Sequence, residues 1–271
     1  MYYTGVVNRK MLKEQSKDWM RRAQPAVWLV ALVYMLAVNL IPNVINSLTP
    51  YTVEMSKILA YVEMGDTYTA MSMLTDILTS PAGYLMLFVS IAVSLFTSVV
   101  GWGYTSYSLG VIRGENPGYG EMFSRFYMAG KIILALILET VYVFLWSLLF
   151  VIPGIVAAYR YRMVVYVLLD DPDCHVGEAF QRSKLLMLGR KKELFMLDLS
   201  FFGWLLLAEL VVMLPSTLFG ISMVAATLER VLAIVVNLLL MPYQEFTFAG
   251  WYEAIRPKEV KQEGPQADPF S

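Results

Sequence analysis

Six long apolar stretches, separated by charged segments, constrain the fold of this chain more than any motif does. They cover roughly residues 26–46, 83–110, 131–152, 154–169, 194–214 and 222–241. An α-helix rises about 1.5 Å per residue, so about 20 residues cross a hydrocarbon core of about 30 Å. Only 16% of the residues are charged, against about 25% in an ordinary soluble domain. The sequence therefore predicts an all-α membrane protein, a six-helix transmembrane bundle.

The distribution of positive charge predicts the orientation of this bundle. Six helices that alternate in direction place residues 1–25, 111–131, 170–192 and 251–271 on one side, and these segments hold most of the 21 lysines and arginines. The long connection on the other side, residues 47–81, holds one lysine among four acidic residues. Because an excess of Lys and Arg marks the cytoplasmic side of a membrane, both termini are predicted to be cytoplasmic.

Three regions are expected along the chain. Residues 1–25 form a basic amphipathic segment, residues 26–250 a single transmembrane domain, and residues 251–271 a cytoplasmic disordered tail. The first apolar stretch is longer than the core of a signal peptide and lacks an Ala-x-Ala exit, so we expect it to be retained. Pro153-Gly154 predicts a tight turn between the third and fourth spans, and Pro242 is expected to end the sixth.

Two segments on the predicted cytoplasmic side share the pattern Gly-Glu-x-Phe-x-Arg, at residues 120–125 and 177–182. Each follows an acceptor side chain and a proline, which is a typical helix start. Apolar or small residues then recur at helical spacing, so each segment predicts an amphipathic helix on the cytoplasmic face. These positions are Tyr119, Met122, Phe123, Phe126 and Gly130, and Val176, Ala179, Phe180, Ser183 and Met187. Either an internal duplication or two independent basic loops would explain the pattern.

Such helices are expected to turn their apolar faces toward acyl chains and their cations toward anionic headgroups. The candidate lipid contacts are Arg125, Arg182, Lys184, Arg190, Lys191 and Lys192. The expected partner is therefore a bilayer with anionic headgroups, with a second membrane protein or a second copy of the chain as further options. No nucleic-acid partner is expected, because the membrane accounts for the basic residues.

Signatures of enzymes and metal sites are scarce. The chain has one histidine, His175, which follows its one cysteine, Cys174. Two adjacent side chains cannot complete a zinc site, which needs about four ligands. The sequence has no phosphate-binding loop and no nucleophile elbow. We therefore expect no catalytic residue, no metal and no cofactor, and we do not expect an enzyme.

Charged residues within the spans are the sharper signal, because an unpaired charge in hydrocarbon is unfavourable by several kcal/mol. We expect Glu139 to pair with Arg160 or Arg162, since all three lie about 11–14 Å into adjoining helices. The other ionisable residues of the spans are Asp198, Glu209, Glu229 and Arg230. Among these, Glu209 and Arg230 form a second candidate pair, and Asp198 is expected to meet headgroup water or a nearby cation. Such charges either fix helix order or line a polar pathway.

A series of short motifs runs through the last hundred residues in a specific order. They are Ile152-Pro153-Gly154-Ile155, Tyr159-Arg160-Tyr161-Arg162-Met163, Glu178-Ala179-Phe180, Ser183-Lys184, Met187-x-Gly189, Leu194-Phe195-x-Leu197, Ser200-Phe201-Phe202-Gly203-Trp204, Pro242-Tyr243 and Trp251-Tyr252-Glu253. This order resembles the domain-of-unknown-function 975 family of bacterial integral membrane proteins. The resemblance implies a multi-pass protein of the bacterial cytoplasmic membrane, with no established activity, substrate or cofactor. Relatives commonly carry serine at Arg162, which argues against a family-wide role for that arginine.

Two functions fit these observations. The sequence favours a non-enzymatic membrane-organising or accessory protein that engages lipid or a membrane partner. The alternative is a transporter or channel for an ion or a small polar solute. A water-filled route from Glu139 and the arginines to one face of the membrane would distinguish the second from the first.

Overall fold

The computed structural model describes residues 7–47, 51–220 and 222–257. Across these ranges the regular structure is helical, with no strand. Six helical stretches are long and apolar enough to cross a membrane. They are Val27–Ile45, Pro81–Ile112, Glu121–Leu149, Val151–Asp170, Lys191–Phe219 and Met223–Ile255. The prediction of an all-α fold with six candidate membrane spans is confirmed.

The helices follow one another with short connections. The first half of the chain contains α1 (Arg9–Arg22), α2 (Val27–Met35), a π-helical turn (Leu36–Leu40), α3 (Ile41–Ser47), α4 (Tyr51–Glu63), α5 (Thr67–Thr79) and α6 (Pro81–Ile112). The second half contains α7 (Glu121–Ser124), a 3-10 turn (Arg125–Met128), α8 (Ala129–Leu149), α9 (Val151–Tyr161), α10 (Val164–Asp170), α11 (Val176–Leu186), α12 (Lys191–Phe219) and α13 (Met223–Ile255).

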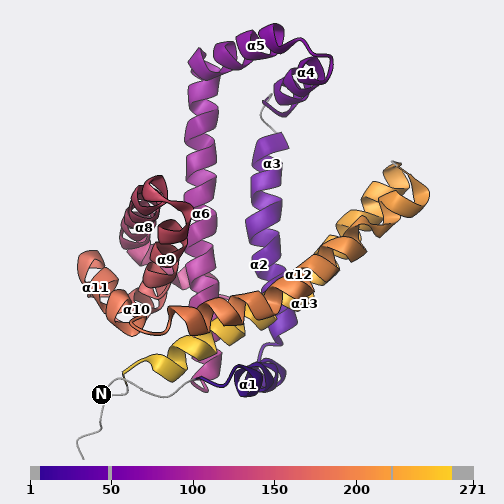
Figure 1. Ribbon diagram of the computed structural model, residues 1–271. Helices are drawn as coiled ribbons and strands as arrows, with labels where there is room; N and C mark the ends of the chain where they lie inside the picture. The colour runs from indigo at the N-terminus through magenta and orange to yellow at the C-terminus, as the bar shows by residue number, and fades with distance from the viewer. Residues whose placement is uncertain (1–6, 48–50, 221, 258–271) are drawn as a thin grey trace, which may run out of the picture.

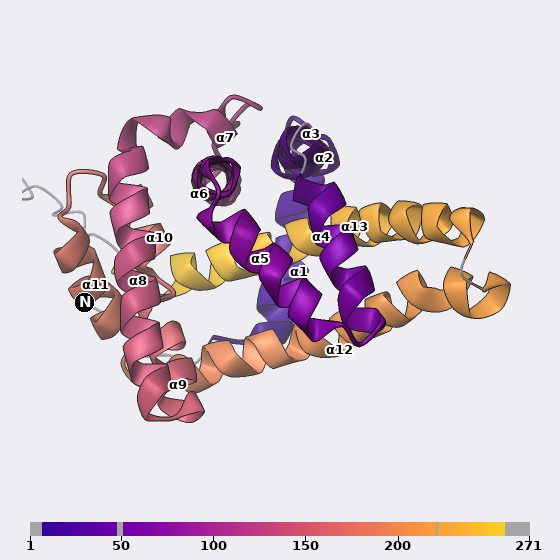
Figure 2. The same ribbon diagram turned by 90° about the horizontal axis from the view of Figure 1, so that it is seen from above.

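The spans converge at one end of the molecule and diverge toward the other. Figure 1 shows α2–α3 and α6 running upward beside each other, with α4 and α5 crossing above them. The α12–α13 hairpin leaves obliquely, and Figure 2 shows it extending away from the other spans. At the lower end α1, the start of α7, α10, α11 and the end of α13 come together. The basic segments α1, 111–131 and 170–192 therefore lie at one end of the molecule, as the charge pattern predicts.

We call the convergent region the packed end and define it as residues 7–37, 99–135, 157–201 and 242–257. Most of the buried apolar side chains of the described residues lie in it. They form two clusters, one around Trp251, Phe201 and Phe180, the other around Tyr107 and Phe246. The outer halves are residues 81–98, 136–156 and 202–241, where most large apolar side chains are exposed. Packing between spans is thus concentrated near one membrane surface.

Two prolines that we expected to mark turns have different roles. Pro153 lies in the first turn of α9, directly after the tight turn from α8, as predicted. A Cβ atom at Gly154 would approach the Ser147 side chain to 2.0 Å, so glycine lets the two helices meet. By contrast, α13 continues through Pro242 to Ile255. The expectation that Pro242 ends the sixth span is wrong, because the following turns are held by burial against other helices.

The last helix also shifts the expected start of the tail. Trp251 and Tyr252 are buried in α13, although we expected the disordered tail to begin at residue 251. The remainder of that tail, residues 258–271, lies outside the described residues.

Candidate functional site

The second amphipathic segment is α11, and its apolar face packs against protein. Val176, Ala179, Phe180, Ser183 and Met187 are all buried. The Phe180 ring meets the Tyr161 and Tyr142 rings at centroid distances of 5.1 and 5.4 Å. The expectation that this face turns toward acyl chains is therefore wrong. Helical periodicity marks an apolar face but does not say whether lipid or protein covers it.

The first amphipathic segment behaves differently from the second. It forms only the short α7 and a 3-10 turn, and of its apolar residues Met122 is buried while Tyr119, Phe123 and Phe126 are exposed. The Met122 carbonyl packs so closely on α6 that a Cβ atom at Gly103 would lie 2.0 Å from its oxygen. Three exposed aromatic rings leave this segment suited to a membrane surface.

The shared Gly-Glu-x-Phe-x-Arg pattern gives the same ion pair in both segments. Arg125 donates to the Glu121 carboxylate at 2.7 Å, and Arg182 donates to the Glu178 carboxylate at 2.6 Å. Each arginine also has a second partner, Ser106 for Arg125 and the Asp171 carboxylate for Arg182. The hydrogen bonds that Arg182 donates to the Glu178 and Asp171 carboxylates raise the pKa of its guanidinium.

These ion pairs change the expected set of lipid contacts. Arg125 and Arg182 are neutralised by protein carboxylates, so they are weaker candidates for headgroups than predicted. The Lys184 ammonium lies 5.8 Å from the Tyr161 ring centroid, and Lys192 is exposed at the start of α12. Lys191 is half-buried there, and Arg190 immediately precedes it.

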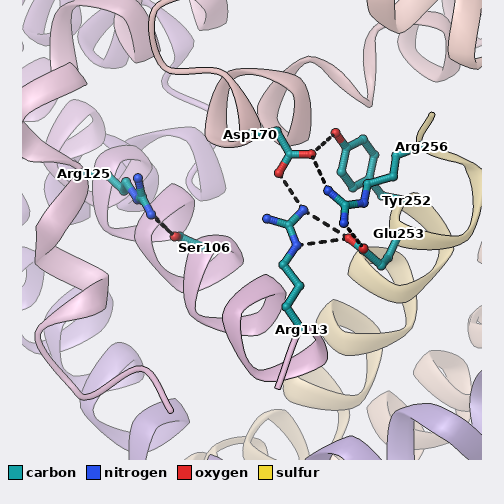
Figure 3. Close-up of polar contacts among 7 residues, drawn as sticks. All are labelled: Ser106, Arg113, Arg125, Asp170, Tyr252, Glu253 and Arg256. Atoms are coloured by element: carbon teal, nitrogen blue, oxygen red, sulfur yellow. Dashed lines mark hydrogen bonds and ion pairs between the residues drawn. The ribbon is translucent and has the colours of Figure 1, made fainter. Parts of the chain in front are cut away.

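An ionic cluster joins the ends of the second, fourth and sixth candidate spans at the packed end. Its members are Arg113 after α6, Asp170 at the end of α10, and Tyr252, Glu253 and Arg256 at the end of α13 (Figure 3). Arg113 donates to Asp170 at 2.6 Å and to Glu253 at 3.1 Å. Arg256 pairs with Glu253 at 2.6 Å and with Asp170 at 3.6 Å. The Tyr252 hydroxyl donates to Asp170 at 2.7 Å.

This cluster has two cations and two carboxylates, so it is neutral as a unit. The four charged side chains are 21–33% exposed, which limits screening by water. The sequence analysis placed Arg113 and Arg256 on the cytoplasmic side but did not identify their partners. The sequence did contain a signal for these partners. Asp170 and Glu253 lie at the ends of helices that must finish on the same side of the membrane as Arg113.

A polar cavity of about 420 Å³ lies beside the ionic cluster. Arg113 and Arg125 line it together with Glu115 and Glu121. Its remaining lining comes from Ser106, Leu109, Gly110, Asn116, Pro117 and Leu169. Because both signs of charge line this cavity, it can hold water or a small dipolar group more readily than a simple anion.

Metal ligands are not gathered in the described residues: no group of three or more His, Cys, Asp or Glu side chains could hold an ion there. Cys174 is buried, and burial raises the pKa of its thiol. A thiol with a raised pKa is a poor nucleophile, because the thiolate is the reactive form.

A second polar centre lies within the spans, around Arg162. Its guanidinium pairs with the Asp198 carboxylate at 2.9 Å and lies 4.4 Å from the Phe248 ring centroid. The Tyr159 hydroxyl donates to the same carboxylate at 2.7 Å. Asp198 thus meets a nearby cation, which is one of the two surroundings expected for it, and Tyr159 is a second protein partner.

The predicted direct pairing of Glu139 is not found. Among the described residues no cation lies within ion-pair distance of Glu139, and Arg160 instead lies 5.9 Å from the Trp146 ring centroid. Arg162 attracts Glu139 only from a greater distance. Both arginines do lie near α8 as expected, but the rotation of α9 directs Arg162 toward α12.

Arg162 also attracts Glu245, a carboxylate that the sequence analysis missed. Glu245 lies three residues after Pro242, beyond the expected end of the span, and α13 carries it into the packed end. Its neighbour is the Thr105 hydroxyl, and one of its oxygens is buried without a hydrogen-bond partner among the described residues. Arg162 therefore pairs with one carboxylate, Asp198, and attracts two others, Glu139 and Glu245, from a greater distance.

The second candidate pair, Glu209 with Arg230, is not formed either. Both side chains are exposed in the outer half, and neither has an ion-pair partner among the described residues. The neighbouring Glu229 accepts a hydrogen bond from the Ser216 backbone N–H at 3.1 Å. That contact ties α13 to α12 next to Pro215, where the proline interrupts the regular backbone pattern.

The basic N-terminal segment forms α1, which lies across the packed end (Figure 1). Leu12, Ser16 and Met20 are buried, and Trp19 packs where a Cβ atom at Gly250 would lie 2.5 Å away. On one flank four cations recur every fourth residue: Arg9, Lys13, Lys17 and Arg21. The first two donate to the Met196 and Ser200 carbonyls of α12.

Like charges are crowded along this row. Burial, Arg9 and Lys17 together lower the pKa of Lys13. Lys10, Lys17, Arg21 and Arg22 are exposed at the surface of the packed end. The acids of α1 are Glu14, which is exposed, and Asp18, which lies 3.9 Å from Arg21.

The comparisons with known proteins agree with the motifs in the C-terminal part of the chain. A family model described as "Protein of unknown function (DUF975)" matches residues 148–259. A search of curated proteins and a search of solved structures each found no match. The matched stretch includes Arg162 and Asp198, and four of the five residues of the ionic cluster. Residues 148–259, from the end of α8 through α13, are therefore similar to the DUF975 family.

Proposed function

We propose that this chain is a non-enzymatic membrane protein, an organising or accessory component whose packed end binds anionic lipid headgroups. One observation carries this proposal: α1 is held against α13 by its own apolar face, which leaves its cations exposed. A helix anchored in this way presents Lys10, Lys17, Arg21 and Arg22 on the surface of the packed end, where anionic headgroups would meet them. Each lysine or arginine near an anionic leaflet contributes about 1 kcal/mol of attraction.

Other features at the same end support the proposal. Tyr119, Phe123 and Phe126 are exposed on the short α7 segment, and aromatic rings are favoured at the membrane–water boundary. Lys192 adds a further exposed cation at the start of α12. In contrast with the sequence expectation, Arg125 and Arg182 contribute mainly to protein ion pairs. The lipid-facing charge is therefore centred on α1 rather than on residues 117–130 and 172–192.

The proposal is tested by titrating the purified chain in neutral detergent with dye-labelled phosphatidylglycerol and phosphatidylcholine. We expect phosphatidylglycerol to bind more tightly at 50 mM salt and this preference to shrink at 300 mM, because salt screens exposed charges. Replacing Lys10, Lys17, Arg21 and Arg22 with glutamine should weaken phosphatidylglycerol binding by at least about tenfold. Replacing Lys57 and Arg230, on the predicted opposite side of the membrane, with glutamine should change phosphatidylglycerol binding little. Equal affinity of the unmodified chain for the two lipids would overturn the proposal.

A transporter or channel for an ion or small polar solute is the second candidate. The observation that favours it is the group of Glu139, Asp198 and Glu245 around Arg162, within the spans of four different helices. Flux of protons or small ions into proteoliposomes would support this function if Glu139→Gln or Glu245→Gln altered it while Lys192→Gln did not. Flux indistinguishable from that of protein-free vesicles would exclude it for the solutes measured.

A further inference from the structure

A groove lies where α1 passes beneath α2 and α13. Lys17, Met20, Arg21, Trp28, Leu239 and Tyr243 line it, and its volume is about 260 Å³. These residues come from three elements that are far apart in sequence: the N-terminal helix, the start of the first span and the middle of the last helix. Neither the ionic cluster nor the Arg162 centre shares a residue with it.

The groove lies at the depth of a membrane–water boundary. Trp28 is the second residue of α2 and is 41% exposed. Tyr243 follows Pro242 on α13 and presents its ring to the ammonium of Lys17, which lies 5.7 Å from the ring centroid. Tryptophan and tyrosine are enriched at this depth because each has an apolar body and a polar group. The two rings therefore place the groove between the headgroups and the hydrocarbon.

The charge in the groove suits an anion. Lys17 and Arg21 lie one helical turn apart on α1, so their side chains reach the same place. Both belong to the row whose first two members donate to carbonyls of α12. Two acids share α1 with them. Asp18 lies 3.9 Å from Arg21 with a side chain that is 57% exposed, and Glu14, three residues before Lys17, is exposed as well, so both offset this charge only weakly.

The opposite wall of the groove is apolar and leads into the hydrocarbon. Leu239 lies one helical turn from Tyr243 in the direction of the span and is 53% exposed. Met20 closes the floor and is buried. A ligand that fits both walls has a negative group at one end and an alkyl chain at the other.

We infer that this groove binds one anionic phospholipid, with its phosphate between Lys17 and Arg21 and an acyl chain against Leu239 and Trp28. The volume of about 260 Å³ is below the ~300–1,000 Å³ of sites that enclose a whole drug-sized ligand. It is thus suited to a headgroup whose chains remain in the bilayer. This inference rests on the proposed function and makes it specific, because it assigns a site to one lipid molecule.

The test compares two variants that each remove two positive charges from α1. Lys17→Gln/Arg21→Gln changes the groove, and Lys10→Gln/Arg22→Gln removes two exposed cations of the same helix that do not line it. At 100 mM salt the groove variant should bind dye-labelled phosphatidylglycerol about tenfold or more weakly than the unmodified chain. The control variant should bind it less than about threefold more weakly. Soluble glycerol phosphate at millimolar concentration should not displace the lipid, because it lacks the chain that Leu239 contacts.

A second measurement does not depend on the charge variants folding. Phosphatidylglycerol brominated on its acyl chains should quench part of the tryptophan fluorescence of the unmodified chain, and Trp28→Phe should remove that part. Unchanged quenching in Trp28→Phe overturns the inference, as does displacement by glycerol phosphate. If the two charge variants weaken phosphatidylglycerol binding equally, the assignment of the site to this groove is overturned. The proposed function stands in that case, because equal weakening indicates diffuse attraction to α1. If the unmodified chain has no preference for phosphatidylglycerol, both proposals fail.

Discussion

The packed end and the outer halves both belong to helices that are apolar enough to cross a membrane, but they differ in what covers them. In the most apolar window of Val151–Asp170, 44% of the residues are buried, against 6% in that of Met223–Ile255. Both windows are long and hydrophobic enough to cross a bilayer. Hydrophobicity alone therefore does not decide which parts of these spans pack together.

The reason lies in the solvent of each region. In hydrocarbon, apolar side chains gain little by leaving lipid for protein, so association depends on close packing and polar contacts. The packed end supplies both: glycines at close approaches, such as Gly103 and Gly250, and ion pairs between helices. The outer halves mainly offer leucine, valine and phenylalanine, which lipid chains cover equally well. Helix order in this protein is therefore set near one membrane surface.

The largest expected effect follows from breaking the ionic cluster. Asp170→Asn leaves Arg113 and Arg256 without one shared counter-charge, so we expect the free energy of unfolding to fall by about 3 kcal/mol. Unfolding in mixed micelles by added dodecyl sulfate, followed by tryptophan fluorescence, measures this change. Asp173→Asn alters an exposed carboxylate in the same connection and should have an effect within about 0.5 kcal/mol. Similar effects of the two variants would show that the cluster does not hold the spans together.

A glycine in each region provides the next comparison. Gly103→Ala at the packed end forces a methyl group against the Met122 backbone, and should lower the free energy of unfolding by about 2–3 kcal/mol. In Gly203→Ala on α12 the added methyl group has no heavy atom of another element within 4 Å. Because alanine has a higher helix propensity than glycine, this change should leave the free energy of unfolding unchanged or raise it by up to about 1 kcal/mol. The same unfolding assay applies. Destabilisation by Gly203→Ala would mean that another surface covers that part of α12.

A smaller effect is expected for the Arg162 centre. In a double-mutant cycle, Arg162→Leu and Asp198→Leu should show a coupling of about 1 kcal/mol, because Arg162 is 39% exposed and partly screened. Arg162→Leu with Glu139→Leu should show a smaller coupling, since these groups interact only at a distance. A larger coupling to Glu139 than to Asp198 would reverse the assignment of partners.

The smallest effects are expected in the outer halves. Phe144→Ala and Leu210→Ala remove side chains that are 60% and 64% exposed, so each should change the free energy of unfolding in detergent by less than about 0.5 kcal/mol. Thermal denaturation of the same variants in liposomes sharpens the comparison. A substantial loss in liposomes alone would indicate that a second protein or a second copy covers the outer halves in the bilayer.

The sequence by itself determined the features that depend on local pattern. Hydropathy identified the six spans, charge distribution placed α1 with residues 111–131 and 170–192, and i,i+4 spacing underlies the pairs Glu121–Arg125 and Glu178–Arg182. The motifs from residue 152 to 253 also pointed to the family whose model matches residues 148–259. Each of these signals is contained within one helix or one connection, so no knowledge of neighbouring helices was required.

Only the tertiary structure decided which groups meet across helices. Two residues two apart on a helix point about 200° apart, so Arg160 and Arg162 had to face different neighbours, but the rotation of α9 selected Asp198 for Arg162. Burial of Trp251 and Tyr252 carried α13 past Pro242 and brought Glu253 to Arg113. The apolar face of α11 looks the same in sequence whether lipid or protein covers it. The relative rotation and position of distant helices, which no local pattern encodes, made these choices.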